Sequence, residues 1–124
     1  MCAPRGRIVV RDVTPDASRS DAYDRMEKLR DPSHTHALTR DEMALLGLGL
    51  PLGQPALHES ITADLSLDTI LATSFPEACS IDEVRAIFRE DAETGEDRLG
   101  FNARIVGEEV RVSYRPTTAV WRRL

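Results

Sequence analysis

Residues 101–115 read FNARIVGEEVRVSYR, and this stretch decides the fold class. On both sides of residues 107–108, β-branched and aromatic residues alternate with polar ones, a pattern typical of antiparallel strands joined by a two-residue turn. In that register Arg104 lies directly opposite Arg111. The stretch therefore predicts a β-hairpin, and with it an antiparallel sheet.

Other segments add strands and helices without a regular β-α-β alternation. Strand patterns occupy residues 7–13 and 60–68, and a last strand is expected after Pro116. Within the first helix, Asp24 is spaced to form an ion pair with Lys28. Helix start signals, of which the last two are capping boxes, occur at Thr14, Thr39 and Ser80. Mixed elements of this kind predict an α+β fold, with a mainly antiparallel sheet and about three helices on one face.

The length and composition indicate one globular domain over residues 1–124. A chain of 124 residues with 41% apolar residues can bury a core of its own. The two cysteines form no C-x-x-C pair, which argues against a disulfide framework. No apolar run is long enough for a signal peptide core or a membrane span. We therefore expect a cytoplasmic protein without membrane association.

Charge is distributed unevenly along the chain. The net charge is −5, but residues 12–97 hold nineteen of the 21 acids, whereas both ends are basic. Fifteen of the sixteen basic residues are arginines, which is expected of a GC-rich bacterial or phage genome. Two oppositely charged faces would follow if the basic ends pair in one sheet.

Arginines near the C-terminus form the first candidate site. Guanidinium groups bind carboxylates and phosphates through paired hydrogen bonds. A partner-binding or anion-binding role is predicted for Arg104, Arg111, Arg115, Arg122 and Arg123. Alternatively, nearby acids neutralise these arginines within the protein. Combined with the helix at Ser80, the basic hairpin also suggests a winged-helix-like DNA-binding regulator, although the acids of that helix would repel phosphates.

An acidic surface is the second candidate. Carboxylates on the helix after Ser80 could contact a basic protein partner. The residues proposed for this surface are Asp82, Glu83, Glu90 and Asp91. A charged helix face that only contacts water would have the same sequence pattern.

Three histidines form the third candidate. His34 and His36 make an H-x-H pair, and His58 follows within 25 residues. Imidazole nitrogens with a neighbouring carboxylate are ligands for zinc and other transition metals. A metal-dependent enzyme is the corresponding hypothesis, although three loop histidines also arise by chance.

Residues 46–53 read LGLGLPLG and are the fourth candidate. A phosphate-binding loop would need a preceding strand, a following helix and usually a lysine, and none is evident here. The glycines are expected to end a helix, with the leucines holding an extended segment on the core. If Leu48 and Leu50 are exposed instead, they form an apolar docking patch.

No catalytic signature is present, so we predict a non-enzymatic binding protein: a small regulator, inhibitor or adaptor of bacterial or phage type. The DNA-binding regulator and the histidine metal enzyme are the alternatives. We expect another protein as the partner, with nucleic acid as the second option, and no cofactor. The sequence is also compatible with a homo-oligomer.

Overall fold

The computed structural model describes residues 5–74 and 78–124. In chain order the elements are β1 (Arg7–Val13), η1 (Ala17–Arg19, a 3₁₀ turn), α1 (Ser20–Arg30), α2 (Arg40–Ala44), β2 (Ala56–Glu59), β3 (Leu65–Ser66), α3 (Leu67–Leu71), α4 (Ala78–Thr94), β4 (Arg104–Val106), β5 (Glu109–Val112) and β6 (Pro116–Arg122). All strand pairs between these elements are antiparallel. The predicted α+β fold class is confirmed.

Three strands form what we call the long sheet, in the order β1-β6-β2. Its register places Val120 of β6 between Val9 of β1 and Ala56 of β2. Because successive side chains alternate between faces, Trp121 points to the opposite face. There Trp121 joins a small core with Met43 of α2, and both side chains are buried.

The short sheet, in the order β3-β5-β4, carries the larger core. Val112 of β5 is fully buried beside Phe88 of α4 and Phe101. Phe101 meets Phe88 edge-on with ring centroids 5.2 Å apart, and it stacks on Tyr23 of α1 at 5.6 Å. Such aromatic pairs add about 0.5–1.5 kcal/mol each beyond their buried area.

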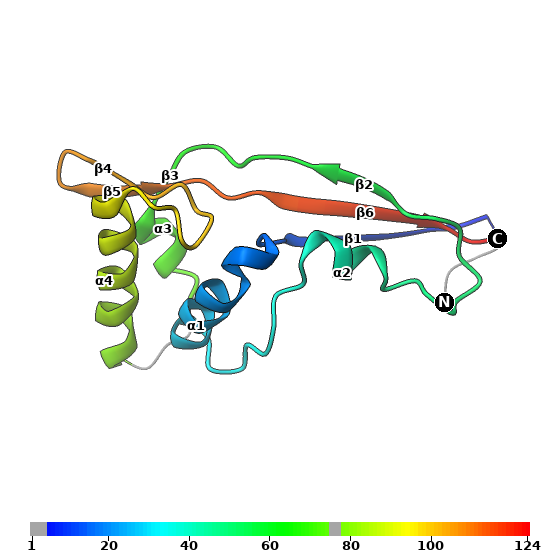
Figure 1. The fold of residues 1–124 in the computed structure, drawn as a ribbon, viewed down its shortest axis with the longest axis horizontal. Coiled ribbons are helices and arrows are strands. Elements are labelled where there is room, and N and C mark those ends of the chain that lie inside the picture. Colours follow the sequence, from blue (N-terminus) through cyan, green and yellow to red (C-terminus); the bar gives the residue numbers. More distant parts are fainter. Residues whose placement is uncertain (1–4, 75–77) are drawn as a thin grey trace.

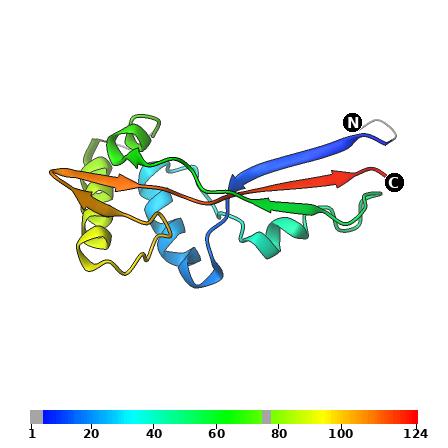
Figure 2. The same cartoon turned by 90° about the horizontal axis from the view of Figure 1, so that it is seen from above.

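The chain passes directly from the short sheet into the long sheet. β5 leads into β6 with only residues 113–115 between them, and the two strands extend along the same direction (Figure 1). All four α-helices of the described chain lie on one side of the strands in Figure 1. Figure 2, seen from above, shows the strands from their other side, where no described helix covers the long sheet. We call that side the bare face.

The hairpin prediction is confirmed. β4 and β5 pair as expected, with Arg104 opposite Arg111 and residues 107–108 in the turn. The predicted strand at 60–68 is wrong for most of its length, because only Leu65 and Ser66 belong to a strand there. Residues 60–64 connect β2 to β3, as a link between the two sheets.

The capping predictions had mixed outcomes. Thr39 is confirmed as the N-cap of α2, with its hydroxyl accepting from the N–H of Glu42. Ser80 does not cap its helix, because α4 already includes Ala78. The helix also continues to Thr94, beyond the predicted end near Asp91.

Candidate functional site

A cavity of about 280 Å³ lies at the carboxyl end of β1. Val13 and Thr14 form one wall, the loop 97–102 forms another, and Ser113 and Arg115 come from the link between β5 and β6. The chain thus brings together segments more than 80 residues apart in sequence, because β1 and β6 are neighbours in the long sheet. The cavity opens where the two sheets meet.

Arg19 organises the acidic side of this cavity. Its Nε donates to the carbonyl oxygen of Asp97 at 2.6 Å, and its guanidinium forms ion pairs with Asp16 and, at 3.7 Å, with the Asp97 carboxylate. Both lining acids therefore face a cation of the protein. Arg115 lines the same cavity but is exposed, and no residue of the described ranges bonds its guanidinium.

Asp91 of α4 holds the loop 97–102, which we call the cavity loop, and its side chain is buried, with the residue only 3% exposed. Its carboxylate accepts the N–H of Arg98 at 2.8 Å and that of Leu99 at 3.2 Å. The loop turns sharply, with Asp97 and Asn102 both in the left-handed region at φ 52° and 46°. Hydrogen bonds to a charged acceptor are worth about 1.5–3 kcal/mol each, which helps to hold this turn.

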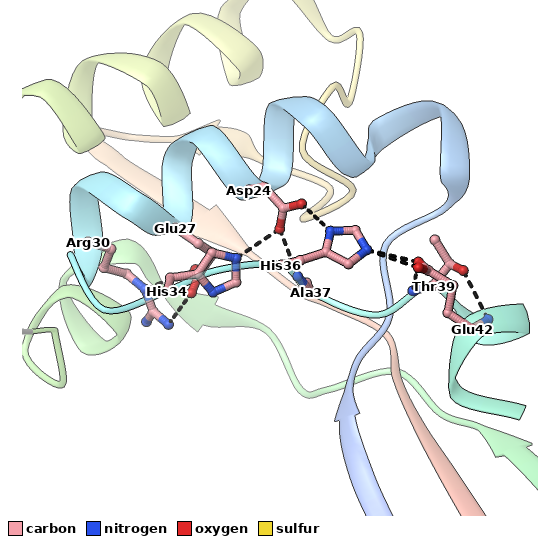
Figure 3. A network of polar contacts seen from close by, with 8 residues as sticks. All are labelled: Asp24, Glu27, Arg30, His34, His36, Ala37, Thr39 and Glu42. Carbon is pink, nitrogen blue, oxygen red and sulfur yellow. Dashed lines mark hydrogen bonds and ion pairs between the residues drawn. The ribbon is translucent and has the colours of Figure 1, made fainter. Parts of the chain in front are cut away.

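A cluster of polar side chains links α1 to the start of α2 (Figure 3). Asp24 of α1 accepts hydrogen bonds from the N–H of Ala37 at 2.8 Å and contacts His34 Nε2 at 2.8 Å. His36 bridges two carboxylates, with Nδ1 2.6 Å from Asp24 and Nε2 3.0 Å from Glu42. We call Asp24, His34, His36 and Glu42 the histidine cluster.

Protonation follows from this geometry. Hydrogen bonds to Glu42 and Asp24 raise the pKa of His36 above its ordinary value of 6.5. Burial alone would raise the pKa of Asp24, but hydrogen bonds from Ala37, His34 and His36 together lower it. The cluster is thus suited to an imidazolium between two carboxylates.

The predicted metal site is not formed. His36 directs its two ring nitrogens to opposite sides, and His58 lies on β2 opposite Thr118, outside the histidine cluster. Across residues 5–74 and 78–124, no group of three or more histidine, cysteine or acidic side chains is placed to hold a metal ion. His34 and His36 instead contact Asp24 and Glu42 and tie the loop after α1 to that helix.

The five predicted anion-binding arginines do not converge. Arg104 and Arg111 are both held by Asp64, which forms ion pairs with each and accepts from Arg111 Nε at 3.1 Å. Asp64 thus offsets the two like charges that face each other across the hairpin. These two arginines are not free for phosphate groups, which argues against the winged-helix-like DNA binder.

The other three arginines lie elsewhere on the structure. Arg115 lines the cavity at the end of β1. Arg122 is exposed at the end of β6, opposite Arg7, and the N–H of Arg123 donates to the Gly6 carbonyl at 3.0 Å. Only Arg115 therefore faces a concave site.

The predicted acidic surface is wrong at one of its four positions. Asp82, Glu83 and Glu90 are exposed on α4 as expected. Asp91 is buried instead, because its carboxylate serves the backbone of the cavity loop. The sequence pattern gave no sign of that loop closing over the helix end.

The leucines of residues 46–53 differ from the main expectation. Leu48 is 81% exposed and Leu50 is exposed as well, so neither holds the segment on the core. Gly47 is the packing residue of this stretch, because a Cβ there would lie 2.7 Å from Trp121 Nε1. The expectation of core leucines is wrong for Leu48 and Leu50, whereas Leu52 packs against the small core. The exposed leucines form an apolar patch beside the long sheet.

The sequence pattern did not identify several residues of these sites. Ser113 and Arg19 carried no motif, and Asp24 was expected to pair with Lys28. Each acts through a partner that is distant in sequence, and only strand pairing or a loop folding back reveals such a partner. No helix among the described residues is both long and apolar enough to cross a membrane.

Two solved structures of longer chains are similar in fold to this protein. No protein-family model and no curated protein matches the sequence. The structure is similar to that of the YcgJ protein of Bacillus subtilis, with a TM-score of 0.72 and 13% identity, covering 97% of this chain and 52% of that one. It is also similar to a candidate methyltransferase of Bacillus halodurans, with a TM-score of 0.66 and 15% identity, covering 96% of this chain and 52% of that one.

These comparisons correct the function predicted from the sequence. The chain spans about half the length of each of the two solved structures. The fold likeness to a candidate methyltransferase contradicts the predicted non-enzymatic regulator, inhibitor or adaptor. The ion pairs of the hairpin arginines argue against the DNA-binding regulator, and the placement of the described histidines argues against the metal-dependent enzyme. What the likeness shows is the fold: an α+β arrangement that forms about half of the chain in both solved structures.

Proposed function

We propose that this chain is one half of a methyltransferase-type enzyme and works joined to a second half that completes it. The observation that carries the proposal is the fold likeness to the candidate methyltransferase of Bacillus halodurans, which covers 96% of this chain and 52% of that one. The YcgJ protein shares the fold with nearly the same coverage. Such an enzyme needs a methyl donor, an acceptor and a site where the two meet.

In this proposal we expect the methyl-donor site in the second half. Nucleotide-type cofactors are commonly held by a glycine-rich turn between a strand and a helix N-terminus. The glycine-rich stretch of this sequence, residues 46–53, instead follows the short helix α2 and packs on Trp121. The residues present therefore do not fit a donor site, and we route no chemical step through them.

β1 offers a surface for joining the second half. Within the described residues β1 pairs only with β6, so its other edge keeps unpaired backbone donors and acceptors. Four of the seven residues of β1, RIVVRDV, are isoleucine or valine, which favour strand structure. A sheet edge of this kind readily accepts another strand.

The bare face of the long sheet continues that surface. Val9, Val120 and Ala56 form an apolar row across its three strands, and Val9 is 60% exposed. Arg7 and Arg122 lie beside this row as a directly opposed pair. An apolar centre with a polar rim is the usual anatomy of a protein interface. The second half is accordingly expected to present apolar residues bordered by acids.

The test is reconstitution from two segments. The chain is expressed with the sequence adjoining it in the genome that encodes a glycine-rich strand-turn-helix, and complex formation is measured by size-exclusion chromatography with light scattering. Methyl transfer from S-adenosylmethionine is then assayed in the complex. We expect a one-to-one complex that binds the methyl donor, which neither segment does as well alone.

A matched pair of valines locates the interface. Val9→Arg places a charge in the apolar row, whereas Val106→Arg changes a valine of similar exposure, 55%, on the distant hairpin. Burying a valine contributes about 1.5–3 kcal/mol, so Val9→Arg should weaken the complex at least tenfold while Val106→Arg leaves it unchanged. Equal effects of both variants, or no complex with any adjoining segment, would contradict the proposal.

A further inference from the structure

The cavity at the end of β1 has the features of a small-ligand site. Its volume of about 280 Å³ lies near the lower limit of the 300–1,000 Å³ typical of ligand pockets. The cavity lies where the carboxyl end of β1 meets the link between β5 and β6, so it is walled by segments from both sheets. Leu99, Val13 and Ile61 supply apolar walls for the non-polar part of a ligand.

Two groups at this cavity have unused hydrogen-bonding capacity. Ser113 is 7% exposed, its N–H donates to the Phe101 carbonyl, and its hydroxyl has no partner among the described residues. That hydroxyl is not among the buried unpaired atoms of the described residues, so it is accessible at the cavity wall and can donate to a ligand. Arg115, two residues later, has five N–H donors without a partner in the same part of the chain.

The acids at the cavity do not compete for Arg115. Asp16 and Asp97 both pair with Arg19, and Arg19 spends its Nε on the Asp97 carbonyl. Their negative charge still disfavours a dianion close by, whereas a single negative charge on Arg115 is balanced. A planar carboxylate matches the fork of donors on a guanidinium.

We propose that this cavity binds a small carboxylate, whose oxygens accept hydrogen bonds from the Arg115 guanidinium and the Ser113 hydroxyl. The apolar remainder of the ligand lies against Leu99 and Val13. The evidence for this binding site comes from the cavity alone. The further statement that its ligand is the substrate of the enzyme rests on the proposed function.

Benzoate is the probe, and benzamide is its neutral counterpart of equal shape. Each is titrated into the ¹⁵N-labelled 124-residue chain, and backbone amide shifts are followed by NMR. We expect saturable benzoate binding in the millimolar range, with shifts confined to the loop 97–102 and residues 113–115. Benzamide should bind far more weakly, and phenyl phosphate, a dianion, no better than benzoate.

Variants assign the contacts. Arg115→Gln should weaken benzoate binding about tenfold and Ser113→Ala about threefold, as expected for a charged and a weaker hydrogen bond. Arg122→Gln, another exposed arginine of the same region of sequence, should leave the affinity unchanged. The dispersed spectrum of each variant reports that it is folded.

Three results would overturn the inference: no saturable benzoate binding, equal affinity for benzamide, or unchanged benzoate affinity in Arg115→Gln. None of these measurements needs the second half of the enzyme. Failure of benzoate binding with successful reconstitution therefore removes the carboxylate site and leaves the proposed function. The opposite outcome removes the proposed function and leaves the site.

Discussion

Replacing Asp24 by alanine should destabilise the protein more than any other change in the histidine cluster. The carboxylate accepts from the backbone N–H of Ala37 and contacts both His34 and His36, at 2.6–2.8 Å. These three contacts hold the segment between α1 and α2 against α1 (Figure 3). Without Asp24 that segment loses its hydrogen bonds to α1 and keeps the edge-on contact of His34 with Tyr23, and the Ala37 N–H loses its acceptor.

The magnitude can be worked from these contacts. A hydrogen bond to a charged group is worth about 1.5–3 kcal/mol, but partial exposure of the two histidines reduces their share. We expect a loss of about 2–4 kcal/mol in the free energy of unfolding. For 124 residues, 1 kcal/mol shifts the melting temperature by roughly 4 °C, so Tm should fall by about 8–16 °C.

The effect should depend on pH in a defined direction. The pKa of Asp24 is lowered below its ordinary 3.8, so its contribution is present above that pH and is lost as pH falls through the lowered pKa. The pKa of His36 is raised above 6.5, so its contribution is present below 6.5 and is lost as pH rises through the raised pKa. The difference between wild type and Asp24→Ala should therefore be largest between these two ordinary values.

Urea unfolding followed by circular dichroism measures this difference, with Asp21→Ala as the control. Asp21 is an exposed acid in the first turn of the same helix, and its loss should cost only about 0.5 kcal/mol. If Asp24→Ala is no more destabilising than Asp21→Ala, or if the difference does not change with pH, the bridging role of Asp24 is refuted.

Three further predictions concern packing, the cavity loop and protonation. Gly47→Ala should cost about 1–3 kcal/mol in urea unfolding, because its Cβ would lie 2.7 Å from Trp121 Nε1. An unchanged midpoint would show that this approach is not tight. Asp91→Ala should cost about 2–4 kcal/mol and speed hydrogen exchange in the loop that it holds. Exchange that stays slow would mean that the loop is held by other contacts. By NMR titration, Glu42→Gln should lower the pKa of His36 toward 6.5, and an unaltered pKa would contradict the bridge.

Much of the short sheet could be predicted from the sequence because its signals are local. The alternation on both sides of residues 107–108 fixes the hairpin register, and the turn residues fix where it reverses. Likewise, the Thr39 capping box is a contact within four residues. Such features need no knowledge of the rest of the fold.

The candidate site could not be predicted in the same way, because its contacts are distant in sequence. The sequence predicted that Arg104 and Arg111 face each other. It did not predict that Asp64, 40 residues before Arg104, forms ion pairs with both. Asp24 had a plausible helical partner in Lys28, and only the loop folding back along α1 gives it two histidines instead. Ser113 and Arg115 can be recognised as cavity residues only from the structure, because the pairing of β6 with β1 places them beside the end of β1.

The edge of β1 that pairs with no described strand has a practical consequence for the isolated chain. Seven residues of β-forming sequence with free backbone groups are a template for any strand, including β1 of another copy. When the chain is purified alone, two copies can align edge to edge, and further copies can then add as aggregates or fibrils at high concentration. Solubility during expression thus becomes a reporter of whether that edge is occupied, and co-expression with a strand that caps it is the remedy that the fold suggests.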